Sequence, residues 1–486
     1  MPAFHRRQIL KLSAMAGASA VLPKVAAASD GDIREDFDVL RAALDIHPGA
    51  LRYLNPAALD AALTVFESEY AATEALDERY LVLSRFLSKL RCGHTYANFY
   101  NQSEAVSEAL FNRKTRLPFA FRWVDGQMVI TRSLSGLNLP SGAIITDING
   151  VAPERMLQQL LPYTRADGAA LGKRIALLEV QHRARIEYFD VFHGLVYGAP
   201  EDGVHRLRAI LPDGRAISVN GPALDLAARK AMRDASPEII KGDGPSWSFE
   251  VRRDIGILTM PSWSTYSFDW DWQDWLEGKL DDVIGLRGLI VDNRRNEGGD
   301  IKVGIQLLTR LIRDPVPLPD IRRLVRFRTF PEALRPHVNT WDSSFYSVGE
   351  RAEAVGHGFY ALPRPQSIDR LAPRGDPIDV PTVLLTSPTN SSAAFTFAYI
   401  AQASGRMKLV GTPTGGNRRG INGDGFFFTT LPVSGIEFDL PMVGQFPVEP
   451  QHDGGVIPDV QVEETAADIA AGRDPAMDAA FSLIED

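Results

Sequence analysis

The sequence contains almost no cysteine and no surplus of positive charge. Cys92 is the single cysteine in 486 residues, so an intrachain disulfide is excluded. Acidic residues outnumber basic ones, 61 to 52, and the formal net charge is −9. This acidity disfavours nucleic acid or an anionic membrane as the main partner. We therefore expect a globular protein that folds without disulfides and binds no nucleic acid.

Motifs for metals, nucleotides and membrane spans are missing as well. The nine histidines are scattered, no His-Glu-x-x-His occurs, and no Gly-x-x-x-x-Gly-Lys phosphate loop is present. No stretch after the first 28 residues is apolar enough, for long enough, to span a bilayer. We expect no metal, no cofactor and no stable insertion into a membrane.

The first 28 residues have the composition of an export leader. Arg6 and Arg7 are followed by apolar residues and Lys11, which is a twin-arginine pattern. An alanine-rich stretch then ends in Ala26-Ala-Ala28, which suits a signal peptidase. The alternative is a basic N-terminus with no export function. We expect a twin-arginine signal peptide over residues 1–28 and a periplasmic or secreted protein.

Beyond the leader, the hydrophobic spacing changes along the chain. Residues 29–114 repeat apolar residues at helical spacing, which predicts a helical N-terminal region whose last helix stops at Gly93. Residues 115–225 predict short alternating strands and include a stretch like the PDZ signature, which would bind an extended peptide or merely hold its neighbours together. A linker or short helix follows. Residues 246–486 predict an α/β domain, with an insertion or lid over 313–380.

Two strand–turn–helix units in this α/β region carry the candidate chemistry. In one, residues 383–385 form an apolar strand, small polar residues follow, and Ala393 lies at the start of a helix. In the other, residues 288–292 form a strand that runs into a polar turn ending in Gly298 and Gly299. Such turns present backbone N–H groups that can bind an anion, and a serine held in one can act as a nucleophile.

These segments resemble the serine peptidases that include the tail-specific (C-terminal-processing) proteases and the tricorn core protease. The matching stretches, in the family's order, are Cys92-Gly-His-Thr95, Leu289-Ile-Val-Asp-Asn-Arg-Arg-Asn-Glu-Gly-Gly299, Thr389-Asn-Ser-Ser-Ala-Ala394, Leu409-Val-Gly-Thr-Pro-Thr-Gly-Gly416 and Gly455-Val-Ile-Pro-Asp459. The resemblance implies a multidomain α/β fold with a helical N-terminal region, a PDZ-like β domain and a crotonase- or ClpP-like catalytic domain. It also implies an endopeptidase that forms an acyl-enzyme and acts on a peptide or protein substrate.

The same resemblance implies roles for the residues of the two turns. Ser392 aligns with the family's nucleophile, and Ser391 becomes a turn or cap residue. The N–H of Ala393 and that of Gly298 or Gly299 would form the oxyanion hole. A serine also needs a base. Tail-specific members use a lysine, but Asn417 stands at that position, and the two arginines after it remain protonated and cannot serve.

Similarity to tricorn-type members implies that His94 is the base instead. With an ordinary histidine pKa near 6.5, the reaction rate should decrease as the pH drops below about 6–7, because the imidazole becomes charged. Such sites also use a carboxylate near the last strand, for which Glu449 and Asp453 are the candidates. The remaining candidates for the base are Lys302, Lys408 and His452. Two other functions stay open, a non-catalytic member that binds a peptide or small apolar ligand and an esterase that uses the same serine.

Overall fold

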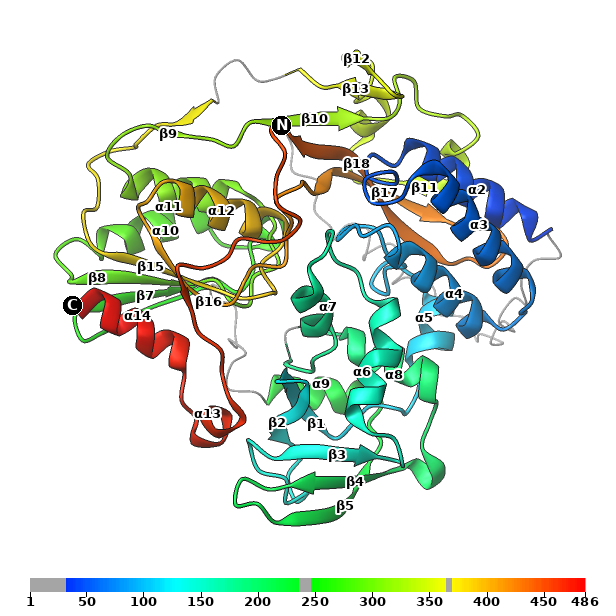
Figure 1. Cartoon of the computed structure of the whole chain (residues 1–486), viewed down its shortest axis with the longest axis horizontal. Helices are drawn as coiled ribbons and strands as arrows, with labels where there is room; N and C mark the ends of the chain where they lie inside the picture. Colours follow the sequence, from blue (N-terminus) through cyan, green and yellow to red (C-terminus); the bar gives the residue numbers. More distant parts are fainter. Residues whose placement is uncertain (1–31, 183, 236–245, 364–368, 486) are drawn as a thin grey trace, which may run out of the picture.

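The computed structural model describes residues 32–182, 184–235, 246–363 and 369–485 (Figure 1). The predicted leader, residues 1–28, lies outside these ranges. Helices and several sheets alternate along the chain, which confirms the predicted multidomain α/β fold. Within the described ranges, no helix is both long and apolar enough to cross a membrane. In the same ranges, no three histidine, cysteine, aspartate or glutamate side chains are grouped so that they could hold a metal ion.

A six-stranded sheet forms the centre of the α/β region. Its strands are β6 (Ser248–Arg252), β7 (Ile255–Thr259), β8 (Gly288–Asp292), β15 (Thr382–Thr386), β16 (Lys408–Gly411) and β19 (Val460–Gln461). They lie in the order β19-β16-β15-β8-β7-β6, and every pair is parallel except the β6–β7 hairpin. The predicted strands in β8 and β15 are confirmed, and both are apolar runs because the sheet is covered on both faces.

Helices cover the two faces of this sheet (Figure 1). On one face, α10 (Trp272–Asp281), α11 (Lys302–Leu311) and α12 (Ser392–Ala403) pack in one apolar core. On the other face lies α14 (Pro475–Glu485), which follows the short helix α13 (Ala466–Ala471). Because β8, β15 and β16 are parallel, the loops after their carboxyl ends meet at one edge of the sheet.

A second six-stranded sheet packs on the N-terminal helices. Its strands lie in the order β11-β17-β18-β10-β13-β12. They are β10 (Ile321–Val325), β11 (Val338–Asn339), β12 (Glu353–Gly356), β13 (Phe359–Ala361), β17 (Asn422–Thr430) and β18 (Glu437–Pro447). The helices are α2 (Arg34–Ile46), α3 (Pro56–Ala71), α4 (Leu76–Ser88) and α5 (Glu104–Phe111), and they share one apolar core with the sheet. Segment 313–380, interpreted above as an insertion or lid, thus contributes strands β10 to β13. It also supplies β9 (Val316–Pro317), which pairs with β14 (Arg370–Leu371).

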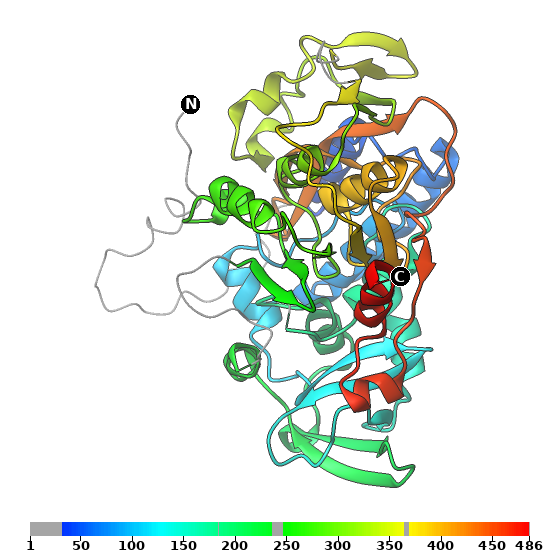
Figure 2. The ribbon, with the colours of Figure 1, turned by 90° about the vertical axis from the view of Figure 1, so that its left-hand side faces the viewer.

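A third sheet, antiparallel throughout, lies at the opposite end of the molecule from β12 and β13 (Figure 2). It consists of β1 (Phe119–Val124), β2 (Gln127–Ser133), β3 (Ile144–Ile148), β4 (Val204–Ile210) and β5 (Ala216–Pro222). The prediction of strands alone was wrong between β3 and β4, where the chain forms α6 (Pro153–Leu160), α7 (Leu171–Leu177) and α8 (Tyr188–Tyr197). Helix α8 is buried over most of its length, so it lacks the one-sided apolar spacing by which a helix is recognised.

A buried ion pair joins α8 to α9 (Leu226–Asp234). The Nε and Nη2 atoms of Arg229 lie 2.9 Å from the two carboxylate oxygens of Asp190. Arg229 also donates to the carbonyl oxygens of Leu117 at 2.8 Å and Phe119 at 3.3 Å. Both charged side chains are at most 4% exposed, so neither charge has water to replace a lost partner.

Removing one partner of this pair should therefore destabilise the protein strongly. We expect Arg229→Ala to lower the free energy of unfolding by about 3–5 kcal/mol, because it leaves the Asp190 carboxylate buried with poor compensation. The matched control is Arg215→Ala, which breaks an exposed pair with Asp213 and should cost less than about 1 kcal/mol. Urea denaturation of the three proteins measures both values. Equal losses in the two variants would contradict the structural role given to Arg229.

Candidate active site

One asparagine holds three loops together at the edge where β8, β15 and β16 end. The side-chain amide of Asn390 donates to the carbonyl oxygens of Asn293 at 2.5 Å and Asn296 at 3.0 Å, in the loop after β8. Its Oδ1 accepts the Ser387 N–H. Its backbone oxygen accepts the N–H groups of Gly415 and Gly416, in the loop after β16. Asn390 is 1% exposed, so these bonds are shielded from water.

The two candidate serines occupy different environments at the start of α12. Ser391 is the N-cap, is 7% exposed and donates from Oγ to the Glu297 carbonyl oxygen at 3.2 Å. Ser392 is only half-buried, and no partner for its Oγ lies among the described residues. Its φ is 51°, in the left-handed region that residues with a Cβ rarely adopt. This backbone turns the Ser392 side chain away from the position an ordinary first helical residue would have.

The loop carrying Gly298 and Gly299 lies directly against Ser392. A Cβ on Gly298 would stand 2.8 Å from the Cβ of Ser392 and 2.9 Å from the N atom of Ala393, so only glycine permits this approach. The Gly298 N–H already donates to Asn296 Oδ1 at 2.7 Å. In the described part of the chain, the N–H groups of Gly299 and Ala393 have no acceptor. The residues that directly follow Ser392 and Gly298 thus each carry an N–H that is not engaged within the described ranges.

His94 lies in a turn that follows α4. The expectation that Gly93 ends this helix was wrong, since α4 ends at Ser88 and the chain turns at Arg91, whose φ is 50°. The imidazole is half-buried and packs on Phe426, with 5.5 Å between ring centroids. Its Nδ1 is buried and has no hydrogen-bond partner in the ranges that the structure describes.

The surroundings of His94 keep its imidazole neutral. Burial, together with the positive charges of Arg165 and Lys173, lowers the pKa of His94 to about 3, although Glu297 opposes them. The expected fall in rate below about pH 6–7 is therefore not supported by this environment. His94 and Ser392 both lie near the Glu297–Gly298 segment. The charge of Glu297 acts on His94, and Gly298 packs against Ser392. Among the described residues, no hydrogen bond joins the two side chains.

The glycine before His94 makes room for a carboxylate that the sequence did not indicate. The Gly93 N–H donates to Asp167 Oδ1 at 2.8 Å. A Cβ on Gly93 would stand 2.5 Å from Asp167 Oδ2, so a larger residue cannot be placed there. Asp167 is 2% exposed, and Oδ2 is without a partner in the described ranges. Burial raises the pKa of Asp167 to about 6, although the Gly93 N–H and the charge of Arg52 lower it.

Asn417, which the sequence resemblance aligns with the family's lysine, uses all its side-chain hydrogen-bonding groups to connect loops. Its Nδ2 donates to Asp453 Oδ1 at 2.7 Å and to the Asp167 carbonyl oxygen at 3.2 Å. Its Oδ1 accepts the Arg419 N–H at 2.8 Å. Asp453 also accepts the Ala169 N–H at 3.0 Å, so its carboxylate fixes the loop that carries Asp167. The pKa of Asp453 is lowered, because the bonds from Asn417 and Ala169 together outweigh its partial desolvation.

The other predicted alternatives lie at the surface. Glu449, Lys302, Lys408 and His452 are all exposed. Within the described residues, none of them forms a hydrogen bond or ion pair with Ser392 or His94.

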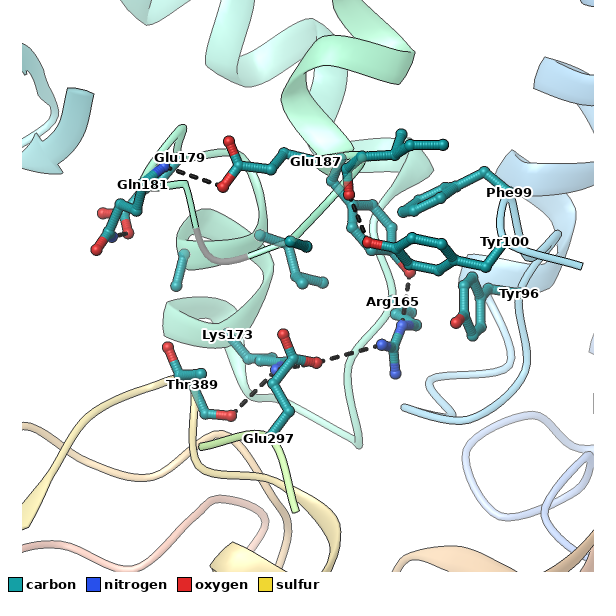
Figure 3. Close-up of a pocket in the computed structure, with 15 residues that line it drawn as sticks. Tyr96, Phe99, Tyr100, Arg165, Lys173, Glu179, Gln181, Glu187, Glu297 and Thr389 are labelled. Atoms are coloured by element: carbon teal, nitrogen blue, oxygen red, sulfur yellow. Dashed lines mark hydrogen bonds and ion pairs between the residues drawn. The ribbon is translucent and has the colours of Figure 1, made fainter. Parts of the chain in front are cut away.

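Two cations from the segment between β3 and β4, buried Lys173 and partly buried Arg165, meet Glu297 beside the site (Figure 3). Lys173 is 3% exposed; its Nζ lies 3.2 Å from Glu297 Oε2 and donates to the Thr389 carbonyl oxygen at 3.1 Å. Arg165 lies 3.4 Å from the same Oε2 and stacks over the ring of Tyr96. These groups line a cavity of about 200 Å³ together with Phe99, Tyr100 and Tyr188. No motif marked Lys173 or Arg165, because their role depends on contacts made far along the chain.

Comparison with solved structures shows a shared fold. The chain is similar to mature CPAF complexed with lactacystin, with a TM-score of 0.65, 16% identity, and 93% of this chain and 97% of that chain covered. It is similar to mature CPAF with a TM-score of 0.62, 17% identity and the same coverage. A photosystem II D1 C-terminal processing protease matches at a TM-score of 0.39 and 14% identity, over 88% of this chain and 92% of that one.

The family comparison concerns the α/β region that carries the site. A search of curated proteins gave no match. Residues 254–423, which include Gly298, Gly299, Ser392 and Asn417 but not His94, match the model of peptidase family S41. This match confirms the resemblance found in the sequence. The chain therefore contains a region that matches peptidase family S41, and this match supports a serine-type peptidase.

Proposed function

We propose that this protein is an exported endopeptidase that forms an acyl-enzyme on Ser392, with His94 as its general base. The observation that carries the proposal is the strained Ser392 backbone, with φ of 51°, held against Gly298, while the N–H groups of Ala393 and Gly299 have no acceptor among the described residues. Left-handed backbone at a residue with a Cβ costs about 1–2 kcal/mol, and such strain is concentrated at functional sites. Ser391, by contrast, uses its hydroxyl to hold the Glu297 carbonyl oxygen.

The reaction would proceed in two steps. The Ser392 Oγ attacks the scissile carbonyl carbon while His94 accepts its proton, and the carbonyl oxygen becomes an oxyanion. The N–H groups of Ala393 and Gly299 bind that oxyanion, and each such donor contributes about 3–4 kcal/mol to lowering the barrier. His94 then gives the proton to the leaving nitrogen. A water molecule, activated by the same imidazole, hydrolyses the acyl-enzyme.

Asp167 fits the role of a positioning residue in this scheme. Its carboxylate holds the Gly93 N–H at 2.8 Å and so fixes the backbone that carries His94. The loop of Asp167 is in turn held by Asn417 and Asp453. Asn417, which replaces the family's lysine, thus helps to position His94, because it holds the loop of Asp167 and Asp167 holds the Gly93 backbone.

The nucleophile is tested first by paired substitutions. Ser392→Ala and Ser392→Gly should both abolish casein hydrolysis and labelling by a fluorophosphonate probe. The glycine variant should be the more stable of the two, by about 1 kcal/mol, because glycine adopts the left-handed backbone without strain. Ser391→Ala is the matched control and should keep most of the activity. Loss of labelling in Ser391→Ala together with retained labelling in Ser392→Ala would assign the nucleophile to Ser391.

The base is tested by substitution and by the pH profile. His94→Ala should lower kcat by about 10²–10⁴-fold with little change in KM, because proton transfer is lost and binding is not. In the wild type, kcat/KM should hold as the pH falls to about 5, since an imidazole with a pKa of about 3 is still neutral there. A fall near pH 6 that Asp167→Asn removes would come from the Asp167 carboxyl. A fall centred near pH 6.5 that persists in Asp167→Asn would contradict the low pKa of His94.

Export is supported by the twin-arginine pattern at Arg6 and Arg7. Replacing both residues with lysine should leave the full-length precursor in the cytoplasm, because lysine keeps the charge but not the arginine pair. Cell fractionation and immunoblotting of the wild type and the double variant measure this. Normal export of the double variant would overturn the assignment.

A further inference from the structure

A partly exposed aromatic cluster lies beside His94, on the second sheet. It consists of Trp341, Phe345, Phe426 and Phe428. The Trp341 ring lies 5.5 Å from Phe345, 5.7 Å from Phe426 and 5.6 Å from Phe428, measured between centroids. Phe426 also contacts the imidazole of His94, so the cluster is continuous with the proposed base. Trp341 is 55% exposed, which is unusual for the largest apolar side chain.

The path of the chain explains why Trp341, Phe426 and Phe428 are left outside the core, against which Phe345 packs. On β17, Phe426 and Phe428 point to one face, whereas Phe427 and Thr429 point to the other and are buried. Strand β11 pairs with β17 only at Val338 and Asn339. Trp341 follows this short ladder and covers Phe426 and Phe428 without being covered itself. The aromatic face is thus formed but not closed by the protein.

We propose that the aromatic cluster is a subsite that binds an apolar side chain of the substrate on the leaving-group side of the scissile bond. The proposal rests on the function proposed above, in which His94 protonates the leaving nitrogen. The residues attached to that nitrogen must therefore pass close to the ring of His94 and to its neighbour Phe426. Arg165, Lys173 and Glu297 act on His94 through their charges, whereas Phe426 offers it an apolar ring. An aromatic or large aliphatic side chain matches this surface.

The test compares substrates that do and do not extend past the scissile bond. Two internally quenched peptides would differ only in the first residue after the bond, phenylalanine or serine, with the cleaved bond verified by mass spectrometry. A nitrophenyl acyl ester, which has no leaving peptide, reports on Ser392 and His94 alone. Trp341→Ala should lower kcat/KM about tenfold for the phenylalanine peptide, little for the serine peptide and not at all for the ester. Trp341→Phe should restore most of the loss.

Two controls separate this subsite from the function on which it rests. Val355→Ala removes an exposed side chain from β12, at the far edge of the same sheet, and should leave all three rates unchanged. Binding of the labelled peptides to the Ser392→Ala protein, measured by fluorescence anisotropy, detects the subsite without turnover. There, adding Trp341→Ala should weaken binding of the phenylalanine peptide about tenfold.

The possible results test the aromatic subsite and the proposed peptidase function separately. Equal loss on peptides and ester in Trp341→Ala would mean that the cluster supports the position of His94, and would overturn the subsite. Unchanged rates and unchanged binding would overturn it as well. A wild type that binds the phenylalanine peptide through Trp341 but hydrolyses neither peptide nor ester would overturn the proposed function and leave the subsite standing.

Discussion

The active-site edge depends on the hydrogen bonds of a single buried residue, Asn390. Parallel strands bring the ends of β8, β15 and β16 to one edge, but they do not fix the loops that follow. Asn390 fixes all three, because it donates to the loop after β8, accepts from its own loop, and offers its backbone oxygen to the loop after β16. The approach of Gly298 to Ser392 follows from this arrangement, and with it the position of the two unengaged N–H groups.

The site is assembled from parts of the chain that fold into different units. Ser392 and the glycine pair belong to the parallel sheet, His94 follows the N-terminal helices, and Asp167 and Lys173 lie between strands of the third sheet. The N-terminal helices share one continuous apolar core with the second and third sheets. Packing in that core therefore decides where His94 lies relative to Ser392. Direct contacts then complete the assembly, including that of Lys173 with Thr389 and that of Asn417 with Asp167.

The sequence predicts those strands, helix starts and turn residues that local patterns of apolar and small polar residues determine. Apolar runs followed by small polar residues located β8, β15 and the start of α12, and the family resemblance selected Ser392 and the glycine pair for testing. Helices α6 to α8 were missed, because they are short and α8 is buried nearly all round. Arg165, Asp167 and Lys173 were missed for a different reason. Their partners Gly93, Glu297 and Thr389 lie far away in sequence, and no local spacing records such a contact. The low pKa of His94 likewise results from burial, which a motif does not contain.

The charges around His94 explain how a weakly basic imidazole can still serve as a base. In the free enzyme, burial and the cations Arg165 and Lys173 disfavour the imidazolium, and Glu297 only partly compensates. In the proposed mechanism, a negative oxyanion forms during attack by Ser392 at the same time as the imidazolium. A negative charge within a few ångströms raises the pKa of the imidazole, and more strongly in a site that excludes water. Proton transfer therefore becomes favourable as the carbon–oxygen bond forms, and not before. His94 thus stays neutral and ready at rest, and Lys173 can hold the Thr389 carbonyl oxygen beside the site without blocking the reaction.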